Sequence, residues 1–402
     1  MSLALDIASQ PNPTGDELRA RARAIVPELR KLSFEADRLR RLPDESMALV
    51  REAGFIRIIQ PLSCGGFGLS MRTHLDVVSI VGEGCGATAW VLGVCNAHSW
   101  MMGHVNAQAQ QDVFGDGPDV LIAASLAPRG KAVRQADGSY IANGVWPFGS
   151  GCQHAGWMFL GAEIFDTTGT KIDEADLLVP TGDLQIRDDW FVAGLQGTGS
   201  NTLTATDLAV PAHRYLSLAP WIERQLPTFD AGDEEWMIRA QGIPVLALAL
   251  ASGALGAARC ALETFKQAVR GKKIAYTSYV SDEWIPTQIT LGTADAMIHC
   301  VELALYNIAD EIDDYARRGE SMPLPLRGRI RMECAHSVRM LMEAVDKLFI
   351  GSGATGLSLK GPLQRVNRDL RAANMHGFLL LDSCAELYGR ILLGKEPNSP
   401  IV

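Results

Sequence analysis

The feature that most constrains the fold is a change in the spacing of apolar residues along the chain. Up to about residue 117 they recur at helical spacing. From about 119 to 217 they form short runs between turn residues, and after that the helical spacing returns. Amphipathic helices repeat every ~3.6 residues and half-buried strands every ~2. The sequence therefore predicts a helical block, a β segment and a second helical block, with boundaries at 1–118, 119–217 and 218–402.

Each block has a more specific expectation. Ala136-Asp137-Gly138 separates two runs of alternating apolar residues, which is typical of a β-hairpin. At least five strands fit the middle block, so we expect a β barrel or sandwich. Long amphipathic or apolar segments in the last block predict a four-helix bundle. The most apolar stretch, around 243–255, is shorter than the ~20 residues that span a bilayer, so it predicts a buried helix.

Composition narrows the function. The chain has 402 residues, is 47% hydrophobic and carries a formal charge of −9. Such a charge argues against a nucleic-acid or anionic-membrane surface. The first residues lack a basic segment followed by an apolar run, so no secretory signal is expected. The 8 cysteines include no CxxC pair, which favours reduced core thiols in a cytoplasmic protein over disulfides or a metal site.

A glycine-rich motif resembles a nucleotide-binding fingerprint and does not meet its conditions. Gly351, Gly353 and Gly356 spell GxGxxG. A Rossmann site requires a strand before the motif, whereas the preceding residues have helical spacing. The motif is therefore expected to end a helix, where its backbone could approach a flat ligand.

Several polar and aromatic residues could carry chemistry. They are Trp90 and His98 before the β segment, Ser125 at the end of its first run, Ser150 in the hexapeptide WPFGSG at 146–151, and Arg368-Asp369 followed by His376. Each also has a purely structural interpretation, such as a hydrogen-bonded core histidine, a turn serine or an ion pair. The sequence contains no GxSxG elbow, HExxH or P-loop that would point to a hydrolase, zinc protease or kinase.

The ordered features resemble a known family. A helix–β–helix chain with WPFGSG in its β segment and RVNRDLRAANMHG near its end resembles the acyl-CoA dehydrogenase fold. Within that fold, residues 16–395 resemble the oxygenase components of two-component flavin-dependent monooxygenases. This group includes the 4-hydroxyphenylacetate 3-hydroxylase oxygenase, the secosteroid phenol hydroxylase and dibenzothiophene monooxygenase.

A missing glutamate separates the two chemistries of this fold. Dehydrogenases of the fold use a glutamate base after the Arg-Asp pair or on the first long helix of the final bundle. Here Arg368-Asp369 is followed by Asn374-Met375-His376-Gly377, and residues 244–259 contain no glutamate. The resemblance therefore favours oxygenation over dehydrogenation.

The resemblance also implies residue roles. Trp90 would line the flavin pocket, His98 would face a substrate hydroxyl, Ser125 would lie beside flavin and substrate, and Ser150 would bond flavin N5. His376 would lie at the oxygen site and is the first choice of base, with His98 second. Further contacts are expected from Gly351, Gly353 and Arg368 to the flavin. Arg270 or Lys272 of a neighbouring subunit would reach the flavin phosphate, and Trp236 and Trp284 would contact the substrate.

The implied reaction needs a second protein. A flavin reductase would supply reduced FMN or FAD, dioxygen would add at C4a to give a hydroperoxide, and one oxygen atom would pass to a phenolic or indolic small molecule. The exposed bundle face predicts a homotetramer. Two alternatives stay open, an acyl-CoA dehydrogenase or oxidase with bound FAD and a non-catalytic member that binds flavin or an aromatic ligand. The substrate, the choice of FMN or FAD, and dimer versus tetramer also stay open.

Overall fold

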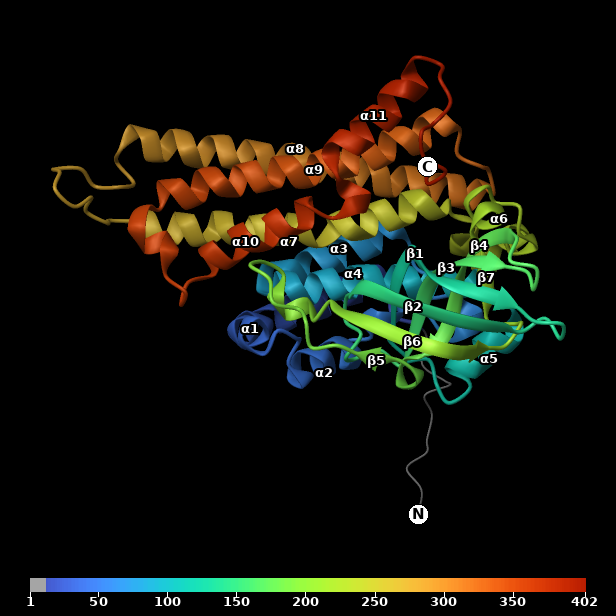
Figure 1. Ribbon diagram of the computed structural model, residues 1–402. Helices are drawn as coiled ribbons and strands as arrows, with labels where there is room; N and C mark the ends of the chain where they lie inside the picture. The colour runs from blue at the N-terminus through green and yellow to red at the C-terminus, as the bar shows by residue number, and fades with distance from the viewer. Residues whose placement is uncertain (1–11) are drawn as a thin grey trace.

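The computed structural model describes residues 12–402 and begins with the expected helical block. Its helices are α1 (Gly15–Leu39), α2 (Asp44–Glu52), α3 (Met71–Gly84), α4 (Gly86–Met101) and α5 (Ala107–Phe114). α1 begins at a capping box, in which Thr14 and Glu17 bond each other's backbone N–H groups. Figure 1 shows α3 and α4 lying between α1 and α2 on one side and the C-terminal bundle on the other.

Small residues allow α3 and α4 to pack closely against the bundle. A Cβ on Gly256 would lie 1.7 Å from the carbonyl oxygen of Ser79, and one on Gly253 would lie 3.1 Å from Cβ of Ala89. These contacts bring the backbones of α3 and α4 against α7 (Gly242–Val269).

The β segment is a single mixed sheet. Its strands are β1 (Ile122–Arg134), β2 (Tyr140–Gly149), β3 (Trp157–Phe165), β4 (Lys171–Pro180), β5 (Gln185–Ile186), β6 (Asn201–Val210) and β7 (Tyr215–Ser217). They pair in the order β5-β6-β2-β1-β3-β4-β7, with β1 and β3 parallel and the other pairs antiparallel. The predicted hairpin joins β1 and β2. Where a barrel or sandwich was expected, the strand order leaves β5 and β7 as the sheet's two edges.

The last block is a bundle of long helices. After α6 (Leu218–Ile222) come α7, α8 (Ile285–Arg318), α9 (Leu324–Gly351), α10 (Pro362–Asn374) and α11 (Leu381–Leu392). The segment expected as a fourth helix is divided into α10 and α11, and His376 lies in the break between them. α7 is long and apolar enough to cross a membrane, but 89% of its most apolar window is buried in the fold.

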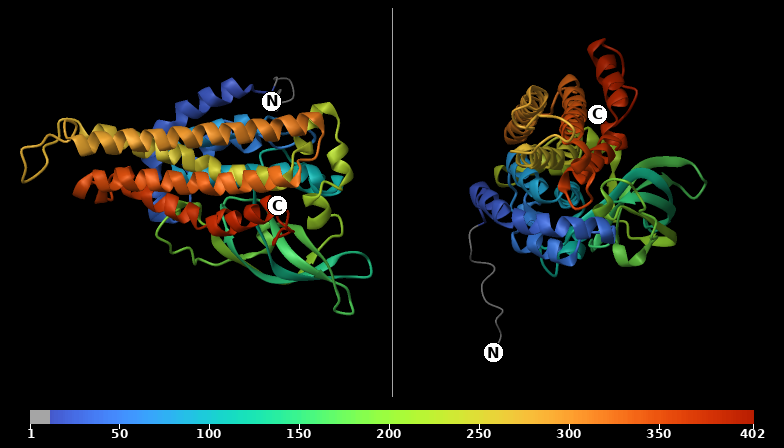
Figure 2. Two further views of the ribbon diagram at one scale, coloured as in Figure 1. Left: turned by 90° about the horizontal axis from the view of Figure 1, so that it is seen from above. Right: turned by 90° about the vertical axis from the view of Figure 1, so that its left-hand side faces the viewer.

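The views of Figure 2 place the bundle and the sheet relative to each other. The loop between α7 and α8 projects past one end of the bundle, and the sheet lies toward the opposite end. GxGxxG follows α9, so its predicted position after a helix is confirmed. All strands lie within 122–217, and the boundaries 1–118, 119–217 and 218–402 remain our proposed division into domains.

Candidate active site

Ser150 lies at the seam between the sheet and the first helical block. It follows Gly149, the last residue of β2, and the backbone N–H of Gly151 donates to the carbonyl of Thr198 at 2.9 Å. Phe148, two residues earlier, has φ +65° and a side chain that is 66% exposed. A bulky residue in the left-handed region is strained. The turn therefore exposes the Phe148 ring two residues before Ser150, where it meets Trp190 edge-on with centroids 6.1 Å apart.

Trp90 and His376 meet at Ser150. The indole Nε1–H of Trp90, on α4, donates to Ser150 Oγ at 3.2 Å. The Trp90 ring packs edge-on against the His376 imidazole, with centroids 5.5 Å apart and planes 62° apart. The predicted residues Trp90, Ser150 and His376 therefore converge from all three blocks of the chain.

Sequence reasoning missed two further residues at this point. Ser200 Oγ lies 2.7 Å from Ser150 Oγ, and Thr198 Oγ1 lies 2.6 Å from Ser200 Oγ. Both side chains are buried. We call Trp90, Ser150, Thr198, Ser200 and His376 the seam cluster. The small polar run Gly197–Asn201 was the only sequence signal, and such runs are also typical of ordinary turns.

Ser125 and His98 lie along the same seam. The Ser125 hydroxyl donates to the carbonyl of Pro147, just before the exposed Phe148, at 2.8 Å. His98 Nδ1 lies 3.2 Å from the carbonyl of Ile122, three residues before Ser125 on β1. On α4, His98 is about two turns beyond Trp90, or ~12 Å.

The two histidines differ in which ring nitrogen carries the hydrogen. A carbonyl oxygen only accepts, so His98 Nδ1 carries the hydrogen and Nε2 is the acceptor. His376 Nδ1 accepts from the backbone N–H of Phe378 at 3.3 Å, so its hydrogen is on Nε2. Neither Nε2 forms a hydrogen bond within residues 12–402, and neither is a fully buried atom. The site thus offers one free acceptor, from His98, and one free donor, from His376.

Burial keeps both imidazoles neutral near pH 7. It lowers the pKa of His98 to about 4 and the pKa of His376 to about 4. Removal from water penalises the charged imidazolium. Each ring therefore stays neutral, with one N–H group and one unprotonated nitrogen.

Arg368 and Asp369 connect α10 to the seam. The Arg368 guanidinium donates to the carbonyl of Ala193 and forms an ion pair with Asp37 at 2.9 Å. Asp369 accepts from the backbone N–H of Leu195 at 2.6 Å. Burial, followed by the nearby Asp37 charge, raises the pKa of Asp369 to about 7. The Arg368 guanidinium is already bonded to α1 and to the 193–195 loop. The expected contact between Arg368 and the flavin is therefore not evident in this chain.

The remaining predicted residues lie elsewhere. Arg270, Gly351 and Gly353 are at the far end of the bundle, where Lys272 Nζ donates to the carbonyl of Ser352 at 3.1 Å. We call residues 270–285 and 351–361 the bundle tip. Gly253 contacts α4 beside Trp90, and α7 runs ~24 Å further before it ends at Val269. Within one chain, the tip cannot join the seam cluster.

Trp236 and Trp284 do not cover a common pocket, contrary to expectation. The Trp236 ring lies 3.8 Å from the guanidinium of Arg317, near the C-terminal end of α8. Trp284 is the residue that precedes α8 and stacks with Tyr279. A 34-residue helix is ~50 Å long. The two tryptophans therefore belong to opposite ends of the bundle.

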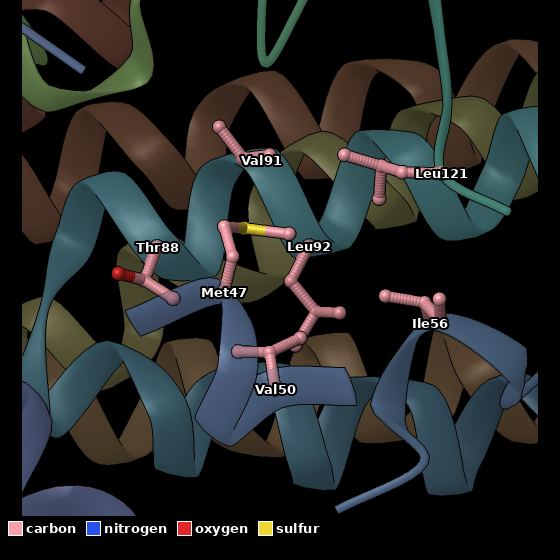
Figure 3. Close-up of a pocket in the computed structure, with 7 residues that line it drawn as sticks. All are labelled: Met47, Val50, Ile56, Thr88, Val91, Leu92 and Leu121. Carbon is pink, nitrogen blue, oxygen red and sulfur yellow. The ribbon is translucent and has the colours of Figure 1, made fainter. Parts of the chain in front are cut away.

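A gap between α2 and α4 is not a second site. Figure 3 shows its lining. The empty space measures about 180 Å³, has no room for a water molecule, and is lined by Met47, Val50, Ile56, Thr88, Val91, Leu92 and Leu121. Thr88 and Leu92 lie on the face of α4 opposite Trp90. The described residues also include no cluster of three metal-binding side chains.

Neither position at which the resemblance would place the glutamate of a dehydrogenase supplies a carboxylate to the seam. Glu263, the first acid on α7, has a half-exposed side chain and pairs with Lys266 at 2.6 Å. At the place where Trp90 meets the α10–α11 break, the residue is His376. The expectation from the missing glutamate therefore agrees with the observed arrangement.

The donor set suits the ring of a flavin. An isoalloxazine has flat apolar faces and a polar edge with both donors and acceptors. The seam offers the Ser150 hydroxyl, the Nε2–H of His376, the edge of Trp90 and the exposed Phe148 ring. Pockets of this kind combine aromatic walls with a few placed polar groups. These residues fit the group that the sequence suggested.

Comparison with known proteins identifies the family of the chain. Residues 248–380 match the family described as acyl-CoA dehydrogenase, C-terminal domain. The chain is 35% identical over 364 residues to the flavin-dependent monooxygenase, oxygenase subunit HsaA, of Rhodococcus jostii, which covers 88% of this chain and 92% of that protein. Its fold matches the crystal structure of 3-HSA hydroxylase from Rhodococcus sp. RHA1, with a TM-score of 0.90 and 32% identity over 97% of this chain and 100% of that one. XiaF from Streptomyces sp., in complex with FADH2 and glycerol, matches with a TM-score of 0.89 and 29% identity over 96% and 97% of the two chains.

Proposed function

The chain belongs to the oxygenase subunits of the flavin-dependent monooxygenases, and we propose that it hydroxylates a phenolic or indolic small molecule with dioxygen and with reduced flavin from a separate reductase. The observation that carries this proposal is the meeting of Trp90, Ser150 and His376 where a dehydrogenase of this fold would need a carboxylate. Reduced flavin supplies the activation of dioxygen when it is bound.

The seam cluster would hold the flavin ring. Ser150 would bond the polar edge of the ring, while Trp90 and the exposed Phe148 would pack against it. Aromatic walls at this site would exclude water and strengthen the polar contacts. The protein would thereby favour oxygen transfer over loss of hydrogen peroxide.

The tautomers assign different roles to the two histidines. His98 Nε2 accepts, so it would take the proton of a substrate hydroxyl. The proton of Ser125 is committed to Pro147, so Ser125 can only accept from a ligand and would assist in orienting that hydroxyl. His376 carries hydrogen on Nε2 and would donate to oxygen at the ring. This ranking places His98 ahead of His376 as the base and reverses the order that the sequence favoured.

The bundle tip would act on a neighbouring copy. Arg270 is exposed and forms no ion pair within residues 12–402. Its guanidinium would bind flavin phosphate from the next subunit, with Gly351 and Gly353 close by. The choice of FMN or FAD would depend on this end of the site, and relatives offer FADH2 as one precedent.

The exposed apolar residues of the bundle support a homotetramer. Large apolar side chains on α8, α9 and the segments around α10 and α11 are between 49% and 78% exposed: Ile285, Ile289, Leu303, Ile350, Leu357, Leu359, Met375, Leu380, Leu392 and Leu393. Patches of this kind usually mark an interface. We also propose a cytoplasmic location, which accords with eight free cysteines, seven of them buried.

A turnover assay tests the proposed function. Purified protein is mixed in air with photoreduced FMN or FAD and a panel of phenols and indoles, and hydroxylated product and hydrogen peroxide are both measured. We expect product from at least one phenol, and none when the flavin is supplied oxidised. Hydrogen peroxide alone with every compound would favour the non-catalytic alternative. Reduction of bound FAD by acyl-CoA would favour the dehydrogenase.

A further inference from the structure

A chain of hydroxyl groups begins at Ser150 and ends on the backbone. Ser150 Oγ lies 2.7 Å from Ser200 Oγ, and Ser200 Oγ lies 2.6 Å from Thr198 Oγ1. Thr198 Oγ1 in turn donates to the carbonyl of Leu195 at 2.8 Å. Ser200 and Thr198 are 4% and 2% exposed, so water does not compete for these bonds.

The chemistry of the end groups fixes the direction of every hydrogen. The Leu195 carbonyl can only accept, so Thr198 gives its one hydrogen there. Ser200 must then donate to Thr198, and Ser150 must donate to Ser200. At the other end, the Trp90 indole N–H can only donate, and it occupies one lone pair of Ser150 Oγ. Ser150 is left with a single free lone pair and no free hydrogen.

The end of the chain is held in place from both sides. Leu195 has φ +51°, and its N–H donates to the buried Asp369 carboxylate at 2.6 Å. The carbonyl of Thr198 accepts from the N–H of Gly151, directly after Ser150, at 2.9 Å. α10 and the turn after β2 therefore fix the hydroxyl chain, which makes its orientation a property of the folded protein.

This orientation discriminates between the redox states of a flavin. N5 of a reduced flavin carries a hydrogen and donates, whereas N5 of an oxidised flavin only accepts. We propose that Ser200 and Thr198 are positioning residues that hold Ser150 as an acceptor and so make the site select reduced over oxidised flavin. The proposal rests on the proposed function, because it requires the flavin ring to lie at Ser150.

Two substitutions should change the selectivity to different extents. Ser200→Ala removes the acceptor of the Ser150 hydrogen, which can then turn to an oxidised N5. Thr198→Val leaves Ser200 without its acceptor, so Ser200 would donate to Ser150 and leave Ser150 only a hydrogen to offer. One neutral hydrogen bond corresponds to a ~3–10-fold change in affinity. We therefore expect the preference for reduced flavin to fall ~3–10-fold in Ser200→Ala and further in Thr198→Val.

Anaerobic binding measurements test this without turnover. The dissociation constants of oxidised and reduced FMN are measured separately by titration for the wild type, both variants, and the hydroxyl-retaining controls Ser200→Thr and Thr198→Ser. The controls should keep the wild-type ratio, and thermal melting identifies any variant that fails to fold.

The outcomes separate the two proposals. A ratio unchanged in both Ser200→Ala and Thr198→Val, or a loss of affinity that is equal for the two redox states, would overturn the role of the hydroxyl chain. If the wild type bound neither redox form of FMN nor of FAD, the proposed function itself would fail. The assignment would be supported if both variants bound oxidised FMN more tightly than the wild type does, so that the ratio of the two dissociation constants became smaller.

Discussion

The seam cluster and the bundle tip use their polar groups in contrasting ways. At the seam, three hydroxyls and the Trp90 indole are hydrogen-bonded in a chain, and the His376 imidazole packs against the indole. Defined lone pairs and hydrogens are left vacant. At the tip, Arg270 forms no ion pair within residues 12–402, and Tyr276, Tyr279 and Trp284 are exposed. On our proposal, the ring end of the flavin site lies within one subunit, whereas its phosphate end would be completed by the bundle tip of a neighbouring copy.

The largest predicted effect concerns the base at the seam. His98→Asn keeps a donor near the Ile122 carbonyl and removes the acceptor at Nε2. We expect hydroxylation to fall ~10²–10⁴-fold, because a general base contributes about this much. Binding of reduced flavin should stay near the wild-type value. Product and peroxide are measured together in single-turnover reactions.

The matched variant is His376→Asn. Its loss of hydroxylation in the same assay should be smaller than that of His98→Asn. Its main effect should be a larger share of hydrogen peroxide. If His376→Asn abolished hydroxylation while His98→Asn retained it, the roles assigned from the tautomers would be reversed.

An intermediate effect is expected for stability at the link from α10 to the seam. The pKa of Asp369 is raised to about 7 in the fold, above its ordinary value of ~3.9. The folded state therefore loses stability as pH rises from about 4 to about 7, by up to ~4 kcal/mol. Asp369→Asn should flatten this part of the profile, as measured by denaturant unfolding at pH 5 and pH 8.

Asp382→Asn is the control, because Asp382 is exposed at the start of α11. It should leave the pH dependence as it is in the wild type. An identical loss of stability between pH 5 and pH 8 in Asp369→Asn and the wild type would show that Asp369 does not carry this dependence.

The smallest effect is expected at the tip. Arg270→Ala should weaken flavin binding ~3–10-fold, because it removes an exposed charge-assisted contact with phosphate. Lys395→Ala removes a similarly exposed cation near the C-terminus and should change nothing. The affinity of each variant for FMN and FAD is measured by titration. Equal affinities for Arg270→Ala and Lys395→Ala would show that Arg270 does not contact the flavin.

The sequence predicts the fold well because periodicity is a local signal. The helix–β–helix order, the hairpin at Ala136–Gly138 and the helix before GxGxxG all depend on neighbouring residues, and all are confirmed. The break between α10 and α11 was not predicted, because apolar residues keep their helical spacing across it. There the His376 side chain accepts a hydrogen bond from the backbone N–H of Phe378.

The site is only partly predictable, because its geometry depends on contacts between distant residues. Ser150 and Ser200 are bonded across a separation of 50 residues, and no local pattern specifies that distance or the direction of the hydrogens. Trp236 and Trp284 illustrate the opposite error. The resemblance assigned both residues to the substrate, but within one chain the ~50 Å length of α8 separates them.

The most direct test of the central claim is a structure of the complex with FMN. We expect flavin N5 to lie ~3 Å from Ser150 Oγ, with Trp90 and His376 beside the ring and the flavin phosphate toward the bundle tip of another copy. A ring bound elsewhere, with Ser150 bonded only to Trp90 and Ser200, would contradict it.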